Sequence, residues 1–234
     1  MIIQYKYILV AIFIAVFINP GCYKQKNPEI LENAFFNSDI INYSYYSSIS
    51  SSAKVLVYSE NFNNGAGAWW TGDQNNLEAS VSNGSYTIKN SDGTLWRWLK
   101  QNISLDSIRN FEFEARVKMV YSQTNDGAGI ALVNSSGDLL PLLLDVSNQI
   151  SIFNYNKISN KKTDYIPWTY YSWLYASNWT LLTIRKAGDR YFFFVDKNNL
   201  GLELPSTIMI PNEITLFLSG NASMSVDEIT FSYF

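Results

Sequence analysis

The 234-residue sequence contains no histidine and only one cysteine, Cys22. Histidine is the side chain that most often serves as general base and as metal ligand, so its absence excludes Ser-His-Asp and Cys-His nucleophilic sites. A single cysteine cannot form a disulfide within the chain, and zinc sites built from Cys and His are excluded as well. Any chemistry would have to use carboxylates, lysine, tyrosine or a calcium ion held by oxygen atoms.

Charge is also scarce, with 17 basic and 20 acidic residues and a net charge of −3. This balance offers no surface for phosphate groups, so we expect no nucleic acid partner. Aromatic residues, in contrast, make up 16% of the chain. They indicate either a β-rich core or, in addition, exposed rings that stack on a ligand.

Residues 1–21 are typical of a secretory targeting segment. Residues 8–18 form an unbroken apolar run, which has the length of a signal-peptide core and is too short to span a bilayer comfortably. Pro20 and Gly21 end the run, and Cys22 follows at once.

This arrangement resembles a bacterial lipoprotein signal, in which cleavage before the cysteine leaves the thiol of Cys22 to be acylated. Gly21 fits the small residue before the cleavage site, whereas Asn19 departs from the aliphatic residue that such signals prefer. The resemblance implies a membrane-anchored protein of the bacterial cell envelope, either surface-exposed or periplasmic. The alternatives are an ordinary signal peptide or an uncleaved anchor, in which Cys22 is incidental.

Residues 22–53 are rich in Asn, Ser and Tyr and show little hydrophobic periodicity. A polar stretch of low complexity buries too little surface to offset the entropy of ordering it. We therefore predict a flexible tether between the membrane and a domain that spans residues 54–234.

Residues 54–234 show short β-type runs separated by turn residues, with no long helical period. Phe111, Phe113 and Ala115 alternate with charged residues, which is the clearest half-buried antiparallel strand in the chain. The polar stretch 157–164 reads as a loop. The predicted strands are 55–62, 77–81, 85–89, 95–99, 111–119, 126–133, 139–146, 149–155, 179–186, 191–195, 200–204, 213–218 and 224–233. The pattern predicts an all-β fold, with two antiparallel sheets packed face to face in a sandwich or jelly roll.

Residues 178–198 form the strongest hairpin signal. A turn at 187–190 separates two apolar runs, and the second run, 191–195, contains only aromatic and β-branched residues. Because side chains alternate across a strand, one face of this run must meet the core, and the other must be covered or line a groove. We expect Trp179 to lie in the core.

This hairpin resembles the late hairpin of concanavalin A-like and laminin-G-like jelly-roll domains of bacterial surface proteins. The resemblance rests on Trp179, Leu182 to Lys186, Gly188-Asp189 and the run 191–195. Three further stretches agree in order, namely Glu60-Asn61-Phe62 with Trp69 or Trp70, Phe111 to Glu114, and Val226 to Ile229. The resemblance implies the fold for residues 55–234. The hairpin tip departs from it, since a longer polar turn, 196–199, stands where the family has Asn-Gly.

Glu112 and Glu114 come closest to a catalytic carboxylate pair of the kind that glycoside hydrolysis requires. β-Glucan-cleaving relatives of the fold carry Glu-x-Asp-x-x-Glu, but here Arg116 and Lys118 occupy the next positions on the same strand face. Acids that alternate with bases in this way are typical of a solvated outer face. A glycoside hydrolase-like enzyme of the same fold therefore remains an alternative rather than the first hypothesis.

Calcium is the one cofactor that the sequence leaves open. Asp126, next to Gly127, and Asp138, in a turn, offer oxygen ligands of the kind that calcium prefers. Aspartate and glycine also occur in turns for backbone reasons alone, so neither position is specific.

Carbohydrate binding is the leading hypothesis, because flat aromatic rings stack on the apolar faces of sugars. Trp96 and Trp98 share one face of a strand, with Arg97 on the other. A structural or protein-interaction surface module, of the adhesion type, is the alternative, and two or more rings exposed together among polar side chains would favour sugar. The candidate stacking residues are Trp69, Trp70, Trp96, Trp98, Trp168 and Trp173.

Overall fold

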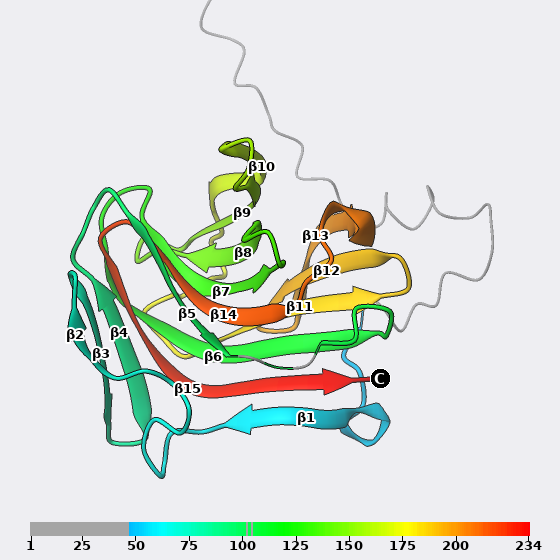
Figure 1. Ribbon diagram of the computed structural model, residues 1–234, viewed down its shortest axis with the longest axis horizontal. Coiled ribbons are helices and arrows are strands. Elements are labelled where there is room, and N and C mark those ends of the chain that lie inside the picture. Colours follow the sequence, from blue (N-terminus) through cyan, green and yellow to red (C-terminus); the bar gives the residue numbers. More distant parts are fainter. Residues whose placement is uncertain (1–46, 102, 104) are drawn as a thin grey trace, which may run out of the picture. The chain divides into compact units, whose positions relative to one another are not determined.

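Strands dominate the computed structural model, which describes residues 47–101, 103 and 105–234 (Figure 1). Two 3₁₀ turns, η2 (Ser51–Ala53) and η3 (Ser206–Ile208), are the helical elements in this part of the chain. The strands are β1 (Val55–Glu60), β2 (Gly72–Gln74), β3 (Leu77–Ser82), β4 (Ser85–Asn90), β5 (Trp96–Gln101), β6 (Phe111–Ser122), β7 (Gly127–Val133), β8 (Leu139–Leu144), β9 (Gln149–Asn156), β10 (Lys161–Tyr170), β11 (Thr180–Ala187), β12 (Arg190–Val195), β13 (Asn198–Pro205), β14 (Glu213–Ser219) and β15 (Ala222–Tyr233).

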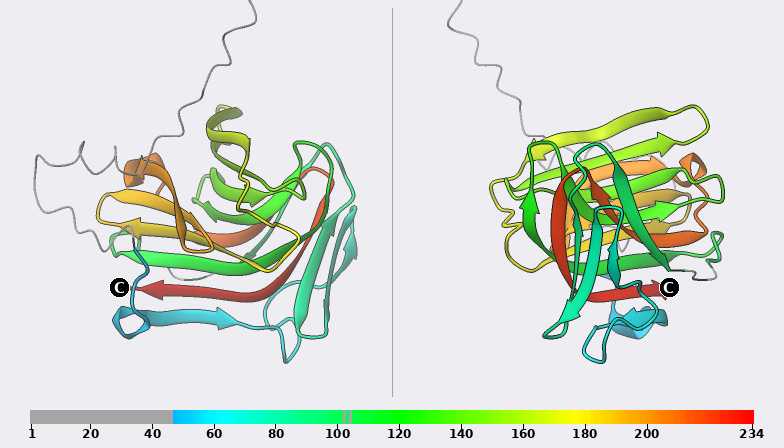
Figure 2. Two further views of the ribbon diagram at one scale, coloured as in Figure 1. Left: turned by 180° about the vertical axis from the view of Figure 1, so that it is seen from behind. Right: turned by 60° about the vertical axis from the view of Figure 1, so that its left-hand side comes forward.

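The strands form two antiparallel sheets that lie face to face (Figure 2). The larger sheet has the order β13-β12-β11-β6-β15-β4-β3-β2, and β1 also pairs with β15. The smaller sheet has the order β10-β9-β8-β7-β14-β5. The predicted all-β, two-sheet sandwich is confirmed.

The core lies between the sheets because each strand turns alternate side chains inward. On β6, Phe111, Phe113, Ala115, Val117 and Met119 are all at most 2% exposed, as the alternation predicted. The strands β7 and β8 are different, since every residue in both is buried. The outer side of the smaller sheet must therefore also be covered by side chains.

The hairpin of β11 and β12 forms as predicted, with a tight turn at Gly188-Asp189 between the paired residues Ala187 and Arg190. The prediction of a longer turn over 196–199, between β12 and β13, is wrong. Val195 pairs with Asn198, so only Asp196 and Lys197 lie in the turn. Their φ angles are 49° and 66°, as a two-residue turn with positive φ at both central positions requires.

Two strands of the structure were not predicted from the sequence. The stretch 157–164 was expected to be a loop, but β10 begins at Lys161 and pairs with β9. The short strand β2 is absent from the predicted strands. Both are edge strands, which receive their register from one neighbour and need no apolar pattern of their own.

Trp179 does not lie in the core, contrary to the expectation from the hairpin pattern. It is half-buried and packs under cations of the neighbouring strand β6. The Nζ atom of Lys118 lies 5.1 Å from the centre of its ring, and the guanidinium carbon of Arg116 lies 5.8 Å away. Trp179 therefore covers the outer face of the larger sheet.

The predicted signal segment, Cys22 and most of the predicted tether lie outside the described residues. Residues 47–53, the last part of that tether, lie on the larger sheet. No helix within the described part of the chain combines the length and the apolar character needed to cross a membrane.

Candidate functional site

The outer side of the smaller sheet carries a cluster of aromatic side chains. Three of the tryptophans that the sequence singled out, Trp96, Trp98 and Trp168, come together there. We use the name aromatic face for the following set: Trp96 and Trp98 from β5, Phe153 and Tyr155 from β9, Trp168 from β10 and Phe217 from β14.

Rings from distant strands of the sheet meet on this face. The ring of Trp96, on edge strand β5, lies 4.9 Å from that of Tyr155 and 5.4 Å from that of Phe153, centre to centre. Both partners belong to β9, and three strands separate β9 from β5 in the sheet order. Phe217 packs between them, 5.7 Å from Trp96 and 6.4 Å from Phe153. The protein's own rings thus cover the middle of the sheet.

Small residues on β7 make this closure possible. Gly127, Gly129 and Ala131 occupy its outward positions and leave space above the strand. A Cβ atom at Gly127 would lie 2.5 Å from the Cη2 atom of Trp168. The absence of a side chain at Gly127 is therefore required for Trp168 to lie over β7.

The aromatic face is only partly open to solvent. Trp98 is 39% exposed, and its ring lies nearly parallel to that of the buried Phe217, at an angle of 12°. Trp96, Tyr155 and Trp168 are half-buried. An indole that packs on one neighbour and remains exposed elsewhere is suited to stack on a flat apolar ligand surface.

Polar side chains border these rings on both sides. Lys100, two residues after Trp98 on β5, is ion-paired with Glu213 at 2.8 Å. On the opposite edge, Lys162 lies 4.5 Å above the ring of Phe153 and pairs with Asp164 at 2.7 Å. Charged groups therefore lie on both sides of the rings.

The same face offers no carboxylate array on its central strands. The outward positions of β8 are Leu139, Pro141 and Leu143, all buried. The acids at the border, Glu213 and Asp164, are each ion-paired with a lysine. The described residues of this face therefore do not supply the carboxylate pair of a glycoside hydrolase.

The remaining candidate tryptophans lie elsewhere. Trp69 is 3% exposed, and its indole N–H donates to the hydroxyl of Tyr58 at 2.8 Å, so it belongs to the core and cannot stack on a ligand. Trp173 is 38% exposed in the loop after β10, where it contacts Tyr171. Trp70 is 37% exposed and lines a pocket at the edge of the sandwich.

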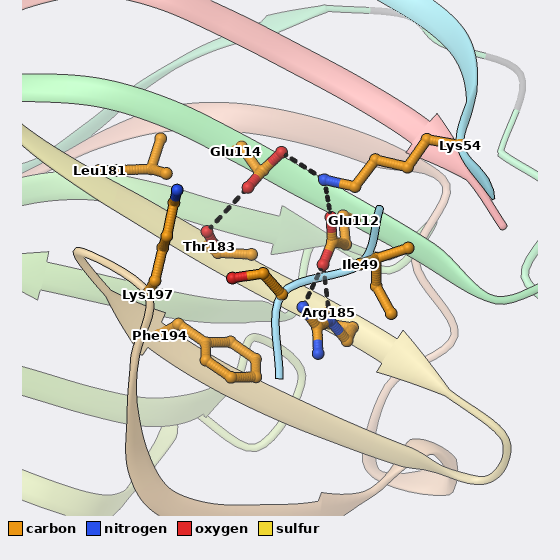
Figure 3. A pocket seen from close by; sticks show the side chains of 10 residues that line it. Ile49, Lys54, Glu112, Glu114, Leu181, Thr183, Arg185, Phe194 and Lys197 are labelled. Atoms are coloured by element: carbon orange, nitrogen blue, oxygen red, sulfur yellow. Dashed lines mark hydrogen bonds and ion pairs between the residues drawn. The ribbon is translucent and has the colours of Figure 1, made fainter. Parts of the chain in front are cut away.

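A second polar site lies on the outer side of the larger sheet. Glu112 and Glu114 of β6 line a pocket of about 270 Å³, together with Thr183 and Arg185 of β11 (Figure 3). The expected solvated face is wrong for Glu112, whose side chain is only 1% exposed, and Glu114 is 21% exposed. The alternation of charges was visible in the sequence, but what covers them was not.

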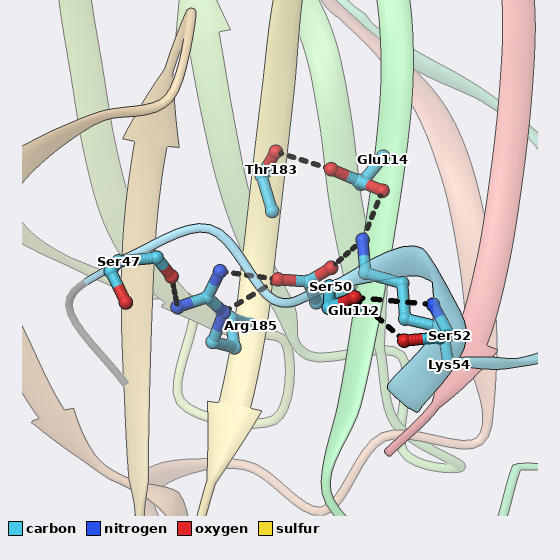
Figure 4. A network of polar contacts seen from close by, with 8 residues as sticks. All are labelled: Ser47, Ser50, Ser52, Lys54, Glu112, Glu114, Thr183 and Arg185. Atoms are coloured by element: carbon cyan, nitrogen blue, oxygen red, sulfur yellow. Dashed lines mark hydrogen bonds and ion pairs between the residues drawn. The ribbon is translucent and has the colours of Figure 1, made fainter. Parts of the chain in front are cut away.

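Residues 47–54, which we call the strap, provide that cover (Figure 4). Arg185 donates to the backbone carbonyl of Ser47 at 2.7 Å. At the other end, Lys54 pairs with Glu112 and, at 2.9 Å, with Glu114. Burial alone would lower the pKa of Lys54, but the hydrogen bonds to both carboxylates and their charges outweigh it and raise that pKa.

The carboxylates of this pocket are engaged by the chain itself. Glu112 is held by Arg185 and Lys54, and Glu114 by Lys54 and by the hydroxyl of Thr183 at 3.3 Å. The next position on this strand face, Arg116, is basic. The network fastens the strap to the sheet and leaves neither carboxylate free for a substrate.

The two calcium candidates serve as turn residues. Asp126 accepts a hydrogen bond from the backbone of Asn221 at 2.9 Å, and burial raises the pKa of its carboxyl group. Asp138 accepts from the amide of Asn134 at 2.9 Å and from the backbone of Lys157 at 2.7 Å. Within the described residues, no group of three or more acidic or sulfur ligands could hold a metal ion.

Comparison with known proteins gives structural relatives only. No protein-family model matches the sequence, and no curated protein matches it either. Among solved structures, the catalytic domain of an endo-1,3-β-glucanase (laminarinase) from Thermotoga petrophila has a TM-score of 0.53 at 12% identity, covering 76% of this chain and 97% of that domain. SCLam, an endo-β-1,3(4)-glucanase of family GH16, has a TM-score of 0.55 at 14% identity, over 80% of this chain and 93% of that one.

The chain is similar in structure to a CBM2 module as well. The CBM2 module of the Dit protein from Lactobacillus casei BL23 phage J-1 has a TM-score of 0.51 at 14% identity and covers 77% of this chain and 96% of the module. The chain folds as a concanavalin A-like jelly roll. This confirms the fold that the late hairpin implied. At such low identity the similarity establishes the jelly roll alone, since one fold supports both catalytic and binding proteins.

Proposed function

We propose that this jelly roll is a non-catalytic carbohydrate-binding module of a bacterial cell envelope, held at a membrane through a lipid on Cys22. The observation that carries the binding proposal is the gathering of Trp96, Trp98 and Trp168 on one solvent-facing side, between two polar borders. The structural relatives, which include both glucanases and a carbohydrate-binding module, support a glycan ligand.

The absence of catalysis is proposed on the geometry of the same face. Trp96 and Tyr155, from opposite parts of the sheet, meet over its middle, so a glycan chain would contact the rings from outside. The middle strand β8 presents Leu139, Pro141 and Leu143 on this face, and none of these side chains can act as an acid or base. These features favour surface binding over cleavage.

Trp98 provides the direct test of binding, with Trp173 as its matched control. The two side chains have nearly equal exposure, 39% and 38%, but only Trp98 belongs to the aromatic face. With a glycan array followed by titration of the best ligand, Trp98→Ala should weaken binding by roughly two- to tenfold, the range of one ring contact. Trp173→Ala should bind like the wild type. If the wild type binds no glycan, the protein-interaction module becomes the better hypothesis.

The proposal that the protein does not cleave glycans is tested separately. Incubating the full-length protein in detergent with β-glucans should release no reducing sugar. Release that is lost in Glu114→Gln would refute the proposal and establish the glycoside hydrolase alternative.

The anchor is tested by chemistry at Cys22. Cells fed an alkyne-tagged fatty acid should label the wild-type protein and not the Cys22→Ser variant. Labelling of both proteins would show that the lipid is attached elsewhere. Labelling of neither would show that Cys22 is not acylated and would favour an ordinary signal peptide.

A further inference from the structure

A pocket of about 340 Å³ lies at the open edge of the sandwich, where β5 of the smaller sheet approaches the turn between β2 and β3 of the larger sheet. Its volume falls in the range of small-molecule sites, roughly 300–1,000 Å³. The pocket is separate from the aromatic face, since it opens between the sheets. Its lining consists of Trp70, Gln74, Asn75, Leu77, Arg97 and Leu99.

Arg97 is the unusual residue of this pocket. It alternates with Trp96 and Trp98 and shares the inward side of β5 with the buried Leu99. One terminal nitrogen of its guanidinium group donates to the backbone carbonyl of Asn75 at 3.1 Å. Its Nε atom is buried and has no hydrogen-bond partner within the described part of the chain. Arginine has five N–H donors, and leaving a buried one unpaired is costly.

No acidic residue lines the pocket to balance this charge. Asp92, half-buried on the loop before β5, lies outside the lining. The pKa of Asp92 is lowered chiefly by hydrogen bonds from Thr94, and the charge of Arg97 contributes less. The pocket therefore presents one cation that no lining carboxylate pairs with, and this positive charge favours an anionic group in a ligand.

Trp70 forms an indole wall of the pocket and is held in position by its neighbours. Its backbone carbonyl accepts a hydrogen bond from the hydroxyl of the buried Tyr86 at 2.5 Å. Its ring packs against Gly72, where the φ angle of 146° favours glycine and where a Cβ atom would lie 3.0 Å from the ring. The ring, 37% exposed, offers a flat surface beside the guanidinium group.

The other polar lining residues suit hydroxyl groups. Gln74 and Asn75 have exposed side chains with amide groups that both donate and accept hydrogen bonds. Leu77 and Leu99 supply the apolar part of the lining. An indole, two amides and a planar cation match a sugar ring that carries hydroxyls and one carboxylate, because the guanidinium fork pairs with a carboxylate through two parallel hydrogen bonds.

We infer that this edge pocket binds a saccharide residue that carries a carboxylate, such as a uronic acid, with Arg97 holding the carboxylate and Trp70 stacking on the ring. The site is distinct from the aromatic face and does not depend on it. A neutral glycan on the aromatic face and an acidic sugar at the edge would then be bound by two independent sites of one domain.

The test uses full-length protein in detergent and a panel of uronic acid oligosaccharides, each paired with its carboxyl-reduced, neutral counterpart. Calorimetric titration should show binding of at least one acidic member and at least tenfold weaker binding of its neutral counterpart. Arg97→Gln and Trp70→Ala should each weaken binding of the acidic sugar by roughly tenfold. Arg97→Lys should restore part of it only, because a lysine keeps the charge and loses the fork.

Two control variants distinguish binding in this pocket from general charge attraction and from binding on the aromatic face. Arg116→Gln removes the same charge from an exposed position and should have no effect, and Trp98→Ala should impair only the aromatic face. If thermal unfolding shows that Arg97→Gln is unstable, Gln74→Ala at the exposed strand edge replaces it. We expect Gln74→Ala to weaken binding of the acidic sugar less than Arg97→Gln would. The inference is overturned if no uronate binds, if the neutral counterparts bind equally well, or if inorganic sulfate competes as well as the sugar.

Discussion

Glu112 and Arg185 face each other across β6 and β11 and form an ion pair that solvent scarcely reaches. Their side chains are 1% and 3% exposed, and Nε and a terminal nitrogen of Arg185 lie 2.6 Å and 2.5 Å from one oxygen of Glu112. The guanidinium group also lies over the ring of Phe194, 4.4 Å from its centre. Both residues of the pair also contact the strap, Arg185 through the carbonyl of Ser47 and Glu112 through Lys54.

Breaking this pair on one side should destabilise the domain strongly. Arg185→Met leaves Glu112 buried with Lys54 as its remaining cation, and removal of one partner of a buried pair costs about 3–5 kcal/mol. Urea unfolding measures this change. Arg116→Met, which removes a half-exposed partner of Asp227, should cost less than about 1 kcal/mol. Equal losses in the two variants would contradict the distinction between the buried and exposed pairs.

The strap should loosen when its lysine is removed. Lys54→Met eliminates the contacts with Glu112 and Glu114, so the hydrogen-bonded backbone amides of residues 53 and 54 should exchange with deuterium faster, while those of β6 remain protected. Lys89→Met, which removes an exposed pair with Glu78, is the control. If these two amides exchange equally fast in the wild type and in Lys54→Met, the lysine does not hold the strap.

The pH range over which Lys54 holds the strap follows from the raised pKa of this lysine. A lysine whose pKa rises on folding contributes its full stability below the unfolded value of 10.5 and loses it as pH rises through the folded value. The protection of the backbone amides of residues 53 and 54 should therefore not weaken through lysine deprotonation between pH 7 and 10.

The small residues of β7 should be intolerant of a single added methyl group. A Cβ atom at Gly127 would clash with the carbonyl oxygen of Leu144 as well as with Trp168. Gly127→Ala should cost about 1–3 kcal/mol, as overpacking does, and alter tryptophan fluorescence. At Gly93 an added Cβ atom would lie 3.7 Å from its nearest neighbour, so Gly93→Ala should be tolerated. Thermal unfolding of the two variants measures the difference. A tolerated Gly127→Ala would show that Trp168 can move aside.

Alkaline unfolding should depend on two buried tyrosines. Burial raises the pKa of Tyr86 and of Tyr191 far above the ordinary 10.0, and their hydroxyls donate to the carbonyls of Trp70 and Met209. The unfolded state releases these protons first, so their stabilising contribution is complete below pH 10 and is lost as pH rises above it. Tyrosinate absorbance should show both groups ionising only on unfolding. Tyr86→Phe should flatten this pH dependence, whereas the exposed Tyr170→Phe should not.

Much of the fold could be predicted from local pattern. The alternation over Phe111 to Met119 identified a core strand. The second face of the run 191–195 was predicted to be covered or to line a groove, and Phe192 and Phe194 are covered there, outside the core. The candidate site was predictable in part. Trp96 and Trp98 share a face through the period of two, but their contact with Phe153 and Tyr155 depends on the order of strands in the sheet.

The sequence by itself determined the all-β sandwich, the hairpin turn at Gly188-Asp189 and the absence of histidine chemistry, because these depend on composition and on alternation along a strand. Tertiary structure alone decided which charges are buried and which rings are exposed. Glu112 is enclosed because Arg185 and the strap, distant in sequence, converge on it, and Trp69 is enclosed while Trp70 stands at a pocket. Alternation assigns a side chain to one face of a sheet, but only the packing of the whole chain determines what covers that face.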